Sequence, residues 1–365
     1  MSAHYHGAAH RSATPTIAIS CQALNNNGGF ERYVRMLVGA LNRRAIRPTV
    51  YARKIDNSLP EAHMVDQAVV RVGFVPGKLR DALFAWRLGS RLAGDRPDVL
   101  ITCNRSIQAD IAVCGGTHPG YLAHIGREAR PSDRLQIALE RRTYASARWV
   151  IAHSPLMADE LRRYYDVPAE KIVVLPPPTV SGQFSPVSEE ARQALRRELG
   201  LPPDRVVFAF SSTSHERKGY EKLQAYFRST DLPVCLMVAG RPVTPLDERI
   251  HYVGYRRDIE NVFRAADFTM IPSRYEPFGL VGIESVMCGT PLVIGDNVGC
   301  AAVLRDEAKI VFHQGDKASF TAAVESAVAR ARSGAARLPE PLATLSYDPS
   351  VDVHLDAVLA LIERR

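Results

Sequence analysis

Short apolar runs alternate with amphipathic stretches along the whole chain, and this alternation constrains the fold more than any other feature. The run TIAIS (16–20) leads through a glycine turn into residues 30–44, which carry one apolar helical face formed by Tyr33, Val34, Leu37, Val38 and Leu41. The further apolar runs are PTVYA, VVRVGFV, DVLITC and ARWVIAHS, and the helical stretches include DALFAWRLGSRLA and PLMADELRRYY. Strands and helices in this order form parallel βαβ units, so the first half is predicted to be an α/β domain.

A proline-rich segment, LPPPTVSGQFSP (175–186), interrupts the pattern. Proline disfavours helix and stiffens an extended connector, so we expect the boundary between two domains here. Beyond it we predict the helices SEEARQALRREL, YEKLQAYF and IENVFRAA, and the strands RVVFAF, VCLMVAG, IHYVGY and FTMIPS. The chain of 365 residues is therefore predicted to form two Rossmann-like parallel-sheet domains, over residues 16–178 and 179–350.

The two ends of the chain are expected to lie outside these domains. Residues 1–15 have the character of a flexible leader, and its three histidines are more simply explained as part of that leader than as metal ligands. Residues 351–365 have an apolar face, so this C-terminal helix should pack back toward the N-terminal domain. The face is formed by Val353, Leu355, Val358 and Leu361.

The charge is distributed unevenly between the two halves. Residues 1–180 carry 24 Lys and Arg against 15 Asp and Glu, a net charge of +9, whereas residues 181–365 carry 22 against 24, a net charge of −2. Clustered cations attract nucleic acid, an anionic membrane surface or a phosphorylated substrate, and an arginine-rich solvated surface explains the same composition. The charge alone does not choose among these.

The composition also bears on metal binding and location. The six cysteines lie in mostly apolar surroundings without the close pairs typical of zinc or redox sites, so we expect buried, reduced thiols and no metal site. No run of about eighteen apolar residues is present, and the first twenty residues lack the apolar core of a signal peptide. We therefore expect a cytoplasmic protein.

Ligands of open parallel sheets bind beyond the carboxyl ends of the strands, and three loops there are suited to phosphate. The first is NNNGG (25–29), in which Gly28 and Gly29 carry no Cβ, so backbone amides can approach an anion or a sugar closely. Its spacing differs from the GxGxxG pattern, which disfavours an NAD site and leaves a plain tight turn as the alternative.

The second loop, SSTSHERKG (211–219), joins a predicted strand to a predicted helix. Arg217 and Lys218 at this junction are suited to holding a diphosphate between fixed cations and the positive end of the helix dipole. The alternative is a solvated basic pair.

The third stretch is SRYEPFGLVGIESVMCGTPLV (273–293). Its predicted helix begins at Leu280 and ends at Met287 or Cys288, because Gly289 can cap the helix and Pro291 prevents its continuation.

Two carboxylates flank the start of this helix with seven residues between them, Glu276 in the loop and Glu284 in the second helical turn. The amides of Phe278, Gly279 and Leu280 face the space between them. A nucleotide sugar presents sugar, diphosphate and ribose in this order, and carboxylates suit the hydroxyls at both ends. Glu284, flanked by apolar residues, would be costly to bury without a partner.

These residues together resemble the donor motif of the retaining family-four glycosyltransferases of GT-B fold. The segments NNNGGFERYV, HSPLMADELRRYYDVPAEKIVVLPPP and ERKGYEKL resemble other parts of that family in the same order, so the resemblance covers nearly the whole chain from residue 16. Within the family the chain most resembles the glucosyltransferases of the lipopolysaccharide core, through GGFERYVRML, DIAVCGGTHPGYL, LERRTY, VLPPP and NVGCAAVL.

The resemblance implies roles for particular residues in the C-terminal domain. Glu276 would hold hydroxyls of the donor sugar, and Glu284 would hold the ribose. The amides that follow Pro277, those of Phe278, Gly279 and Leu280, would bind the diphosphate.

The remaining implied roles connect both domains. Arg217 and Lys218 would neutralise the leaving nucleoside diphosphate, while Gly28 and Gly29 would close over it. His118 matches the family's histidine region near donor sugar and acceptor. Many family members carry an arginine five residues before the lysine, but this chain has Thr213 there, so charge stabilisation must depend on Arg217, Lys218 and backbone amides.

The implied activity is retaining transfer of a hexose, with UDP-glucose as the expected donor, to a hydroxyl of a glycan or glycolipid in lipopolysaccharide core or other cell-surface polysaccharide synthesis. No DxD-like aspartate cluster is present in a suitable loop, so we expect metal independence and no cofactor beyond the nucleotide-sugar co-substrate. The basic half would face a glycolipid at the cytoplasmic side of the anionic inner membrane rather than nucleic acid. A two-carboxylate glycosidase, a nucleotide-sugar epimerase and a non-catalytic nucleotide-sugar or membrane-binding scaffold are the alternatives.

Overall fold

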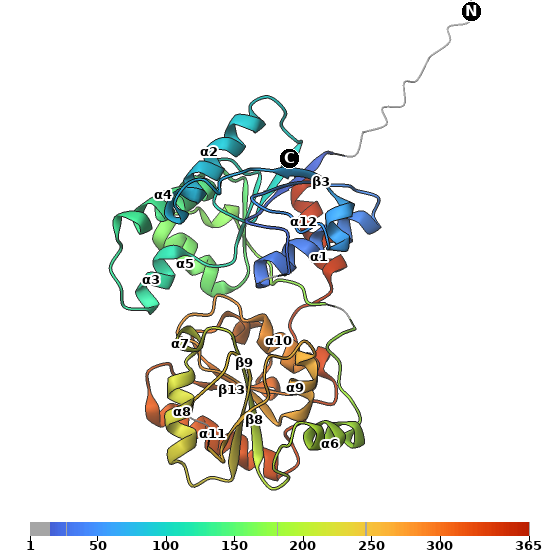
Figure 1. Cartoon of the computed structure of the whole chain (residues 1–365), viewed down its shortest axis with the longest axis vertical. Coiled ribbons are helices and arrows are strands. Elements are labelled where there is room, and N and C mark those ends of the chain that lie inside the picture. The colour runs from blue at the N-terminus through green and yellow to red at the C-terminus, as the bar shows by residue number, and fades with distance from the viewer. Residues whose placement is uncertain (1–14, 27, 181, 245–246, 365) are drawn as a thin grey trace, which may run out of the picture.

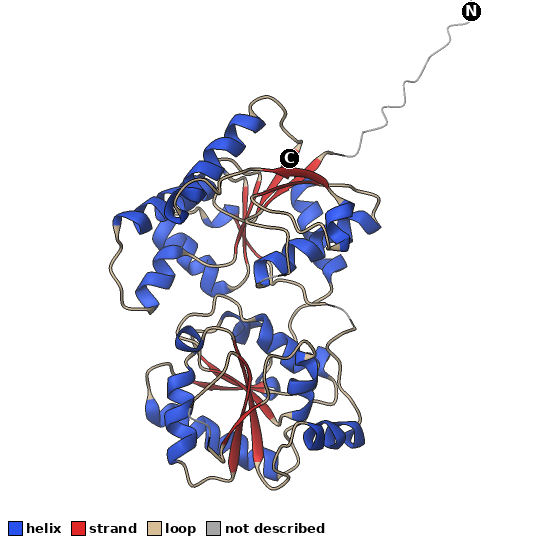
Figure 2. Cartoon of the chain, viewed as in Figure 1, coloured by secondary structure: helices blue, strands red, loops and turns tan. Residues whose placement is uncertain are grey.

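The computed structural model describes residues 15–364 except positions 27, 181 and 245–246. The predicted leader and its histidines therefore fall, apart from Pro15, outside the described residues. The chain forms two α/β lobes stacked along the long axis of the molecule (Figure 1). Helices cover both faces of each sheet (Figure 2), as expected for parallel strands joined by helical crossovers.

The N-terminal lobe contains a seven-stranded sheet in the order β3-β2-β1-β4-β5-β6-β7, with every pair parallel. Its strands are Ile17–Ser20 (β1), Thr49–Ala52 (β2), Asp66–Val69 (β3), Val99–Thr102 (β4), Ile111–Cys114 (β5), Trp149–Ala152 (β6) and Ile172–Val174 (β7). The strand predicted at residues 69–75 was misplaced. β3 ends at Val69, and the apolar residues after it belong to a non-strand segment in which Val70 and Val72 are buried.

The helices of this lobe are Gly29–Arg43 (α1), Arg80–Leu92 (α2), His118–His124 (α3), Pro131–Ser146 (α4) and Pro155–Tyr165 (α5). The predicted apolar face of α1 is confirmed, since all five of its apolar residues are buried in the core. Thr117 and Ser154 cap the N-termini of α3 and α5 through their hydroxyls, which accept hydrogen bonds from the helical N–H groups.

The C-terminal lobe contains a six-stranded parallel sheet in the order β10-β9-β8-β11-β12-β13. Its strands are Val206–Ser212 (β8), Val234–Gly240 (β9), Ile250–Tyr252 (β10), Phe268–Ile271 (β11), Leu292–Gly295 (β12) and Lys309–Phe312 (β13). Its helices are Glu189–Glu198 (α6), His215–Lys218 (α7), Tyr220–Ser229 (α8), Ile259–Ala265 (α9), Leu280–Met287 (α10) and Lys317–Arg332 (α11). The segment predicted as a loop over 211–219 therefore contains the end of a strand and a one-turn helix.

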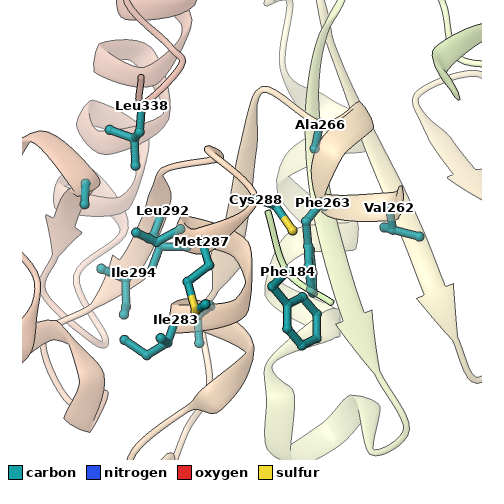
Figure 3. Packing of buried hydrophobic residues seen from close by; sticks show 14 of the residues in the cluster. Phe184, Val262, Phe263, Ala266, Ile283, Met287, Cys288, Leu292, Ile294 and Leu338 are labelled. Atoms are coloured by element: carbon teal, nitrogen blue, oxygen red, sulfur yellow. The ribbon is translucent and has the colours of Figure 1, made fainter. Parts of the chain in front are cut away.

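Helix α10 lies in the core of the C-terminal lobe, where apolar residues of β12, α9 and the linker surround it. Figure 3 shows part of this cluster, including Phe184, Phe263, Ile283, Met287, Leu292 and Ile294. Because six of the eight residues of α10 are buried, the backbone at its N-terminus has a fixed position.

The chain crosses between the lobes twice, and the two crossings are hydrogen bonded to each other. The N–H of Thr179 donates to the carbonyl oxygen of Pro349 at 2.9 Å, and the hydroxyl of Tyr347 donates to that of Pro177 at 3.3 Å. The second crossing leads into Val351–Glu363 (α12).

Helix α12 packs against α1 of the N-terminal lobe, with Leu355, Val358 and Leu361 buried in the core of that lobe. The expected contribution of Val353 was wrong, because this residue is 48% exposed. The buried position beside it is His354, whose Nε2 lies 2.9 Å from the hydroxyl of Tyr33. The polar residue His354 therefore occupies the buried position on α12 that the apolar pattern assigned to Val353.

All six cysteines are buried and unpaired, as predicted, and burial raises the pKa of Cys21 to about 12. Within residues 15–364, leaving aside the four undescribed positions, no helix is both long and apolar enough to cross a membrane.

Candidate active site

The loop at residues 273–279, here called the donor loop, joins the end of β11 to the N-terminus of α10. Gly279 precedes the helix with a φ of 90°, a left-handed conformation that glycine adopts without steric cost. Within the described part of the chain, the backbone N–H groups of Phe278, Gly279 and Leu280 have no hydrogen-bond acceptor. They are the free donors of a helix N-terminus, an arrangement suited to an anion.

Glu276 of the donor loop lies between two cations. Its Oε2 is 2.8 Å from Nζ of Lys218 and 3.2 Å from Nη1 of Arg217, and it accepts a hydrogen bond from Ser273 at 3.2 Å. Burial alone would raise the pKa of Glu276, but Lys218 and Arg217 outweigh it and hold the pKa below its ordinary value. Glu276 is therefore a partly buried, ionised carboxylate whose charge the two cations balance.

The backbone fixes these cations. Gly219 follows α7 with a φ of 80°, and a Cβ at this position would lie 2.4 Å from the carbonyl oxygen of Pro272. Only glycine permits such an approach of the α7–α8 turn to the end of β11. Arg217 also donates to the carbonyl oxygen of Tyr275 at 3.1 Å, so the turn and the donor loop form one unit.

Glu284 is 3% exposed and forms an ion pair with Arg32, which belongs to α1 of the other lobe. Burial raises the pKa of Glu284 despite the opposing effect of Arg32. The sequence indicated that Glu284 needed a partner but did not identify Arg32. The available signal was FERYV, where Arg32 follows Gly28 and Gly29 at the start of α1.

Gly28 and Gly29 stand at the start of α1, so the ion pair of Arg32 with Glu284 brings them toward Glu284. Gly28 has a φ of 89° and precedes α1, and a Cβ on Gly29 would meet nothing within 4 Å. The space beside Gly29 is open, as an approaching ligand would require. The rest of the NNNGG loop includes position 27, which is not described.

The side chain of Tyr275 crosses from the C-terminal lobe into the core of the N-terminal lobe. It is 4% exposed and packs in the same cluster as Tyr144, Met157 and Leu161. Its hydroxyl accepts from the N–H of Thr117 at 3.1 Å and donates to Oε2 of Glu160 at 2.9 Å. The residue that directly precedes Glu276 is therefore held by the other lobe.

Pro277, on the other side of Glu276, is held in the same way. The hydroxyl of Ser154 donates to its carbonyl oxygen at 2.7 Å. A Cβ on Gly299 would lie 1.9 Å from that oxygen, and a Cβ on Gly116 would lie 3.2 Å from the Pro277 ring. Sequence reasoning assigned no role to Tyr275, Ser154 or Gly299, because their importance depends on contacts between distant segments.

His118 lies at the N-terminus of α3, next to Thr117, so its backbone is close to the donor loop. Its imidazole Nε2 is 2.8 Å from Oδ1 of Asp133, and the backbone N–H of His118 donates to Oε2 of Glu140 at 2.9 Å. Arg127 and His118 together hold the pKa of Asp133 well below its ordinary value. Among the described contacts, none joins the imidazole to Glu276, Arg217 or Lys218, so the structure brings His118 near this group without a direct hydrogen bond.

A cavity of about 260 Å³ lies in the N-terminal lobe at the carboxyl ends of its central strands. Its lining is mixed: polar residues that include Gln22, Glu31, Asn104 and Arg105 lie beside apolar residues such as Phe30 and Val113 and the Gly115–Gly116 turn. Gly116 lies beside Pro277, so the same turn borders both the cavity and the donor loop. No group of three His, Cys, Asp or Glu suited to a metal ion is found in the described residues.

The site thus combines a charge-balanced carboxylate, two cations and a helix N-terminus, and both lobes contribute to it. Two parallel-sheet lobes with a candidate ligand site between them define the GT-B class of glycosyltransferases. WaaG, a glycosyltransferase involved in lipopolysaccharide biosynthesis, matches 95% of this chain and 98% of its own with a TM-score of 0.75 at 17% identity. HepE from Anabaena, solved in complex with UDP and glucose, matches 96% and 100% with a TM-score of 0.74 at 16% identity.

Sequence comparison defines the family. Residues 27–179 match the family described as Glycosyltransferase Family 4, and residues 204–330 match that described as Glycosyl transferases group 1. A probable transglycosylase of Burkholderia thailandensis is 49% identical over 349 residues, which are 95% of this chain and 96% of that protein. The chain belongs to the family-four glycosyltransferases of GT-B fold, as the sequence motifs indicated.

Proposed function

We propose that this glycosyltransferase moves a hexose from a nucleotide sugar to a hydroxyl of a glycan or glycolipid, with retention of configuration and without a metal ion. UDP-glucose is the first donor to test, and synthesis of lipopolysaccharide core or another cell-surface polysaccharide is the proposed setting. The observation that carries the proposal is the group formed by Glu276, Lys218 and Arg217 at the N-terminus of α10.

In the proposed complex, the donor spans the two carboxylates. The sugar hydroxyls donate to Glu276, the diphosphate accepts from the free N–H groups of Phe278, Gly279 and Leu280, and the ribose hydroxyls donate to Glu284. Negative charge develops on the diphosphate as the bond to the sugar breaks. Lys218, Arg217 and the helix N-terminus stabilise that charge from fixed positions, which is the main catalytic contribution expected of the protein.

Retention places the incoming hydroxyl and the leaving diphosphate on the same face of the sugar. The acceptor oxygen forms its bond to the anomeric carbon as the bond to the diphosphate oxygen breaks, and the acceptor proton passes to the leaving diphosphate. This proton route needs no additional base from the protein. The fixed cations do the charge-balancing work that a divalent metal does elsewhere, which motivates the proposed metal independence.

The choice of donor and acceptor is supported by similar proteins. HepE was solved with UDP-glucose, and WaaG acts in lipopolysaccharide biosynthesis. The cavity beside the Gly115–Gly116 turn, whose lining includes Gln22, Asn104 and Arg105, gives the acceptor a place next to the donor loop. The nucleotide-sugar epimerase and the non-catalytic scaffold remain rival hypotheses. The relative named as a probable transglycosylase suggests a third rival, in which the donor is a glycan instead of a nucleotide sugar.

The first experiment screens the purified protein for thermal stabilisation by UDP-, GDP- and ADP-sugars. A donor at about one hundred times its Kd adds about 2.7 kcal/mol to the stability of the folded state, a readily measured shift. The preferred donor is then incubated with acceptor glycans, and NMR gives the anomeric configuration of the product. Retained configuration without added metal, and with chelator present, supports the proposal.

Two variants test the site itself. Glu276→Ala should abolish transfer, and Lys218→Ala should weaken donor binding and lower turnover by about 10²–10³-fold, the usual effect of removing one stabiliser of a developing anion. Glu325→Ala, on an exposed position of α11, is the matched control and should retain activity. Full activity of Glu276→Ala overturns the assignment. Conversion of the donor without an acceptor would identify an epimerase, and donor binding without turnover would identify a scaffold. Transfer from an unactivated glycan would identify a transglycosylase.

A further inference from the structure

Large apolar side chains are concentrated on one short part of the surface. Of the nine such side chains that are exposed in the described residues, four lie between positions 69 and 86. Phe74 is 68% exposed, Leu79 49% and Trp86 63%. Exposed aromatic residues so close together are uncommon on a free surface and indicate a contact with something else.

Two of these exposed residues share one face of α2 with the partly buried Leu83. Leu79 directly precedes the helix with helical dihedral angles, so Leu79, Leu83 and Trp86 follow the i, i+4, i+7 spacing of one stripe. The opposite stripe, which includes Phe84 and Leu88, is buried in the core. Leu83 also packs partly against that core, so Leu79 and Trp86 are the uncovered apolar residues of this face.

The segment that carries the uncovered residues is rich in cations. Residues 71–91 contain five basic residues, namely Arg71, Lys78, Arg80, Arg87 and Arg91. Their single acid, Asp81, is directed into the lobe, where it pairs with Arg53 and Arg105. The guanidinium of Arg87 lies 4.9 Å from the centre of the Phe74 ring, which places Phe74 beside the helix.

We propose that this face is the docking surface for an anionic lipid bilayer. We define the α2 surface as Phe74, Leu79, Leu83 and Trp86 with the cations Arg71 and Lys78. Aromatic rings enter the interfacial layer of a bilayer while nearby lysines and arginines are attracted to anionic head groups. A protein partner would gain from the apolar stripe, but a bilayer matches both the stripe and the excess of positive charge.

The α2 surface lies next to the cavity of the N-terminal lobe. Asp81, in the first turn of α2, accepts hydrogen bonds from Gln22 at 3.0 Å and from Arg105 at 3.3 Å, and both of these residues line the cavity. In Figure 1, α2 and α4 lie on one flank of the N-terminal lobe, away from the C-terminal lobe. A bilayer on this flank would present a glycolipid beside the cavity, an inference that rests on the proposed glycolipid acceptor.

The test measures cosedimentation of the full-length protein with vesicles of phosphatidylcholine, with or without phosphatidylglycerol, at low and high salt. Binding should require phosphatidylglycerol and weaken at high salt. Arg71→Glu with Lys78→Glu should weaken binding by about tenfold or more, since each cation near an anionic surface contributes about fivefold in affinity. Phe74→Ser with Trp86→Ser removes the two most exposed rings of the surface and should also weaken binding by about tenfold or more.

The controls make the same chemical changes on the other lobe. Tyr255→Ser removes an aromatic residue that is 74% exposed, and Arg305→Glu with Lys317→Glu makes the same change in net charge as the α2 pair. Both controls should bind vesicles as the unchanged protein does. If they lose binding as strongly as the α2 variants, or if vesicles with and without phosphatidylglycerol bind equally, the proposal is overturned.

Two further measurements separate the possible failures. In a Trp149→Phe background, Trp86 is the only tryptophan, and brominated phosphatidylglycerol should quench its fluorescence. Absence of quenching, or a change from dimer to monomer in Phe74→Ser with Trp86→Ser, indicates self-association instead. Stabilisation by the nucleotide sugar is measured in parallel, and it should be unchanged in all these variants. Vesicle binding without donor binding would reject the proposed function and retain the docking surface.

Discussion

Tyr275 offers the sharpest test of how the two lobes position the candidate site, because Tyr275→Phe removes one oxygen atom and leaves the ring in place. The hydroxyl accepts from the N–H of Thr117 at 3.1 Å and donates to Glu160 at 2.9 Å, and all three residues are buried. In the phenylalanine variant this N–H has no acceptor, and the Glu160 carboxyl group keeps only the hydrogen bond from the Thr117 hydroxyl.

The magnitude follows from these two losses. Leaving the Thr117 N–H without an acceptor costs about 1–3 kcal/mol, and the loss of one of the two hydrogen bonds to Glu160 costs about 1 kcal/mol, so the variant should be destabilised by about 2–4 kcal/mol in total. At about 2.1 cal/mol/K per residue, the unfolding entropy of 365 residues is about 0.8 kcal/mol/K, so each kcal/mol lowers the unfolding midpoint by about 1.3 °C and the expected fall is about 3–5 °C. The volume of the core hardly changes, so no cavity contributes.

The assay is thermal unfolding followed by circular dichroism, with transfer kinetics on the same samples. Because Tyr275 precedes Glu276, the variant should lower kcat more than it raises KM for the donor. This is expected when the donor still binds but the donor loop is no longer aligned with the N-terminal lobe. Tyr255→Phe is the matched control, since that residue is 74% exposed. If both variants melt at the same temperature, the interlobe hydrogen bonds contribute nothing to stability and the reasoning is refuted.

Three further predictions concern the same interlobe contacts. Arg32→Ala leaves the Glu284 carboxylate buried and unpaired, so it should lower the free energy of unfolding by about 1–3 kcal/mol. The loss is smaller than for a fully buried ion pair because Arg32 is partly exposed. Adding Glu284→Gln should restore part of this stability in a double-mutant cycle. Burial raises the pKa of Glu160 above its unfolded value, so its contribution is complete below about pH 4 and is lost as the pH rises through the folded pKa. Glu160→Gln should flatten this fall in the melting temperature above about pH 4, and an unchanged profile would contradict it. Gly299→Ala would drive a Cβ into the donor loop and should destabilise the protein by about 1–3 kcal/mol, whereas Gly73→Ala, with open space around it, should not.

The helices and strands of each lobe could largely be predicted from local sequence patterns. The periodicity of α1 predicted its buried face, and Gly289 with Pro291 predicted the end of α10. The strand predicted at residues 69–75 shows the limit of such reasoning. Periodicity cannot distinguish a strand from a buried irregular segment, because both place apolar side chains in the core.

In the candidate site, too, some residues could be predicted from local motifs and others could not. Glu276, Lys218, Arg217 and the glycines at 28 and 29 were predicted because they lie in contiguous motifs whose chemistry is visible in the residues themselves. The spacing of Glu276 and Glu284 also fixed their places in a loop and in the second turn of a helix. A helix period and a glycine turn are properties of neighbouring residues, so the sequence by itself determined them.

Contacts between the lobes were decided by tertiary structure alone. Arg32 and Glu284 are 252 positions apart, and Tyr275 meets Glu160 across 115 positions. No periodicity links such residues, because their meeting depends on how two independently folded sheets are oriented. The sequence determined which groups each lobe would offer, and the packing of one lobe on the other decided which of those groups became partners, since a buried carboxylate is stable only where a distant donor reaches it.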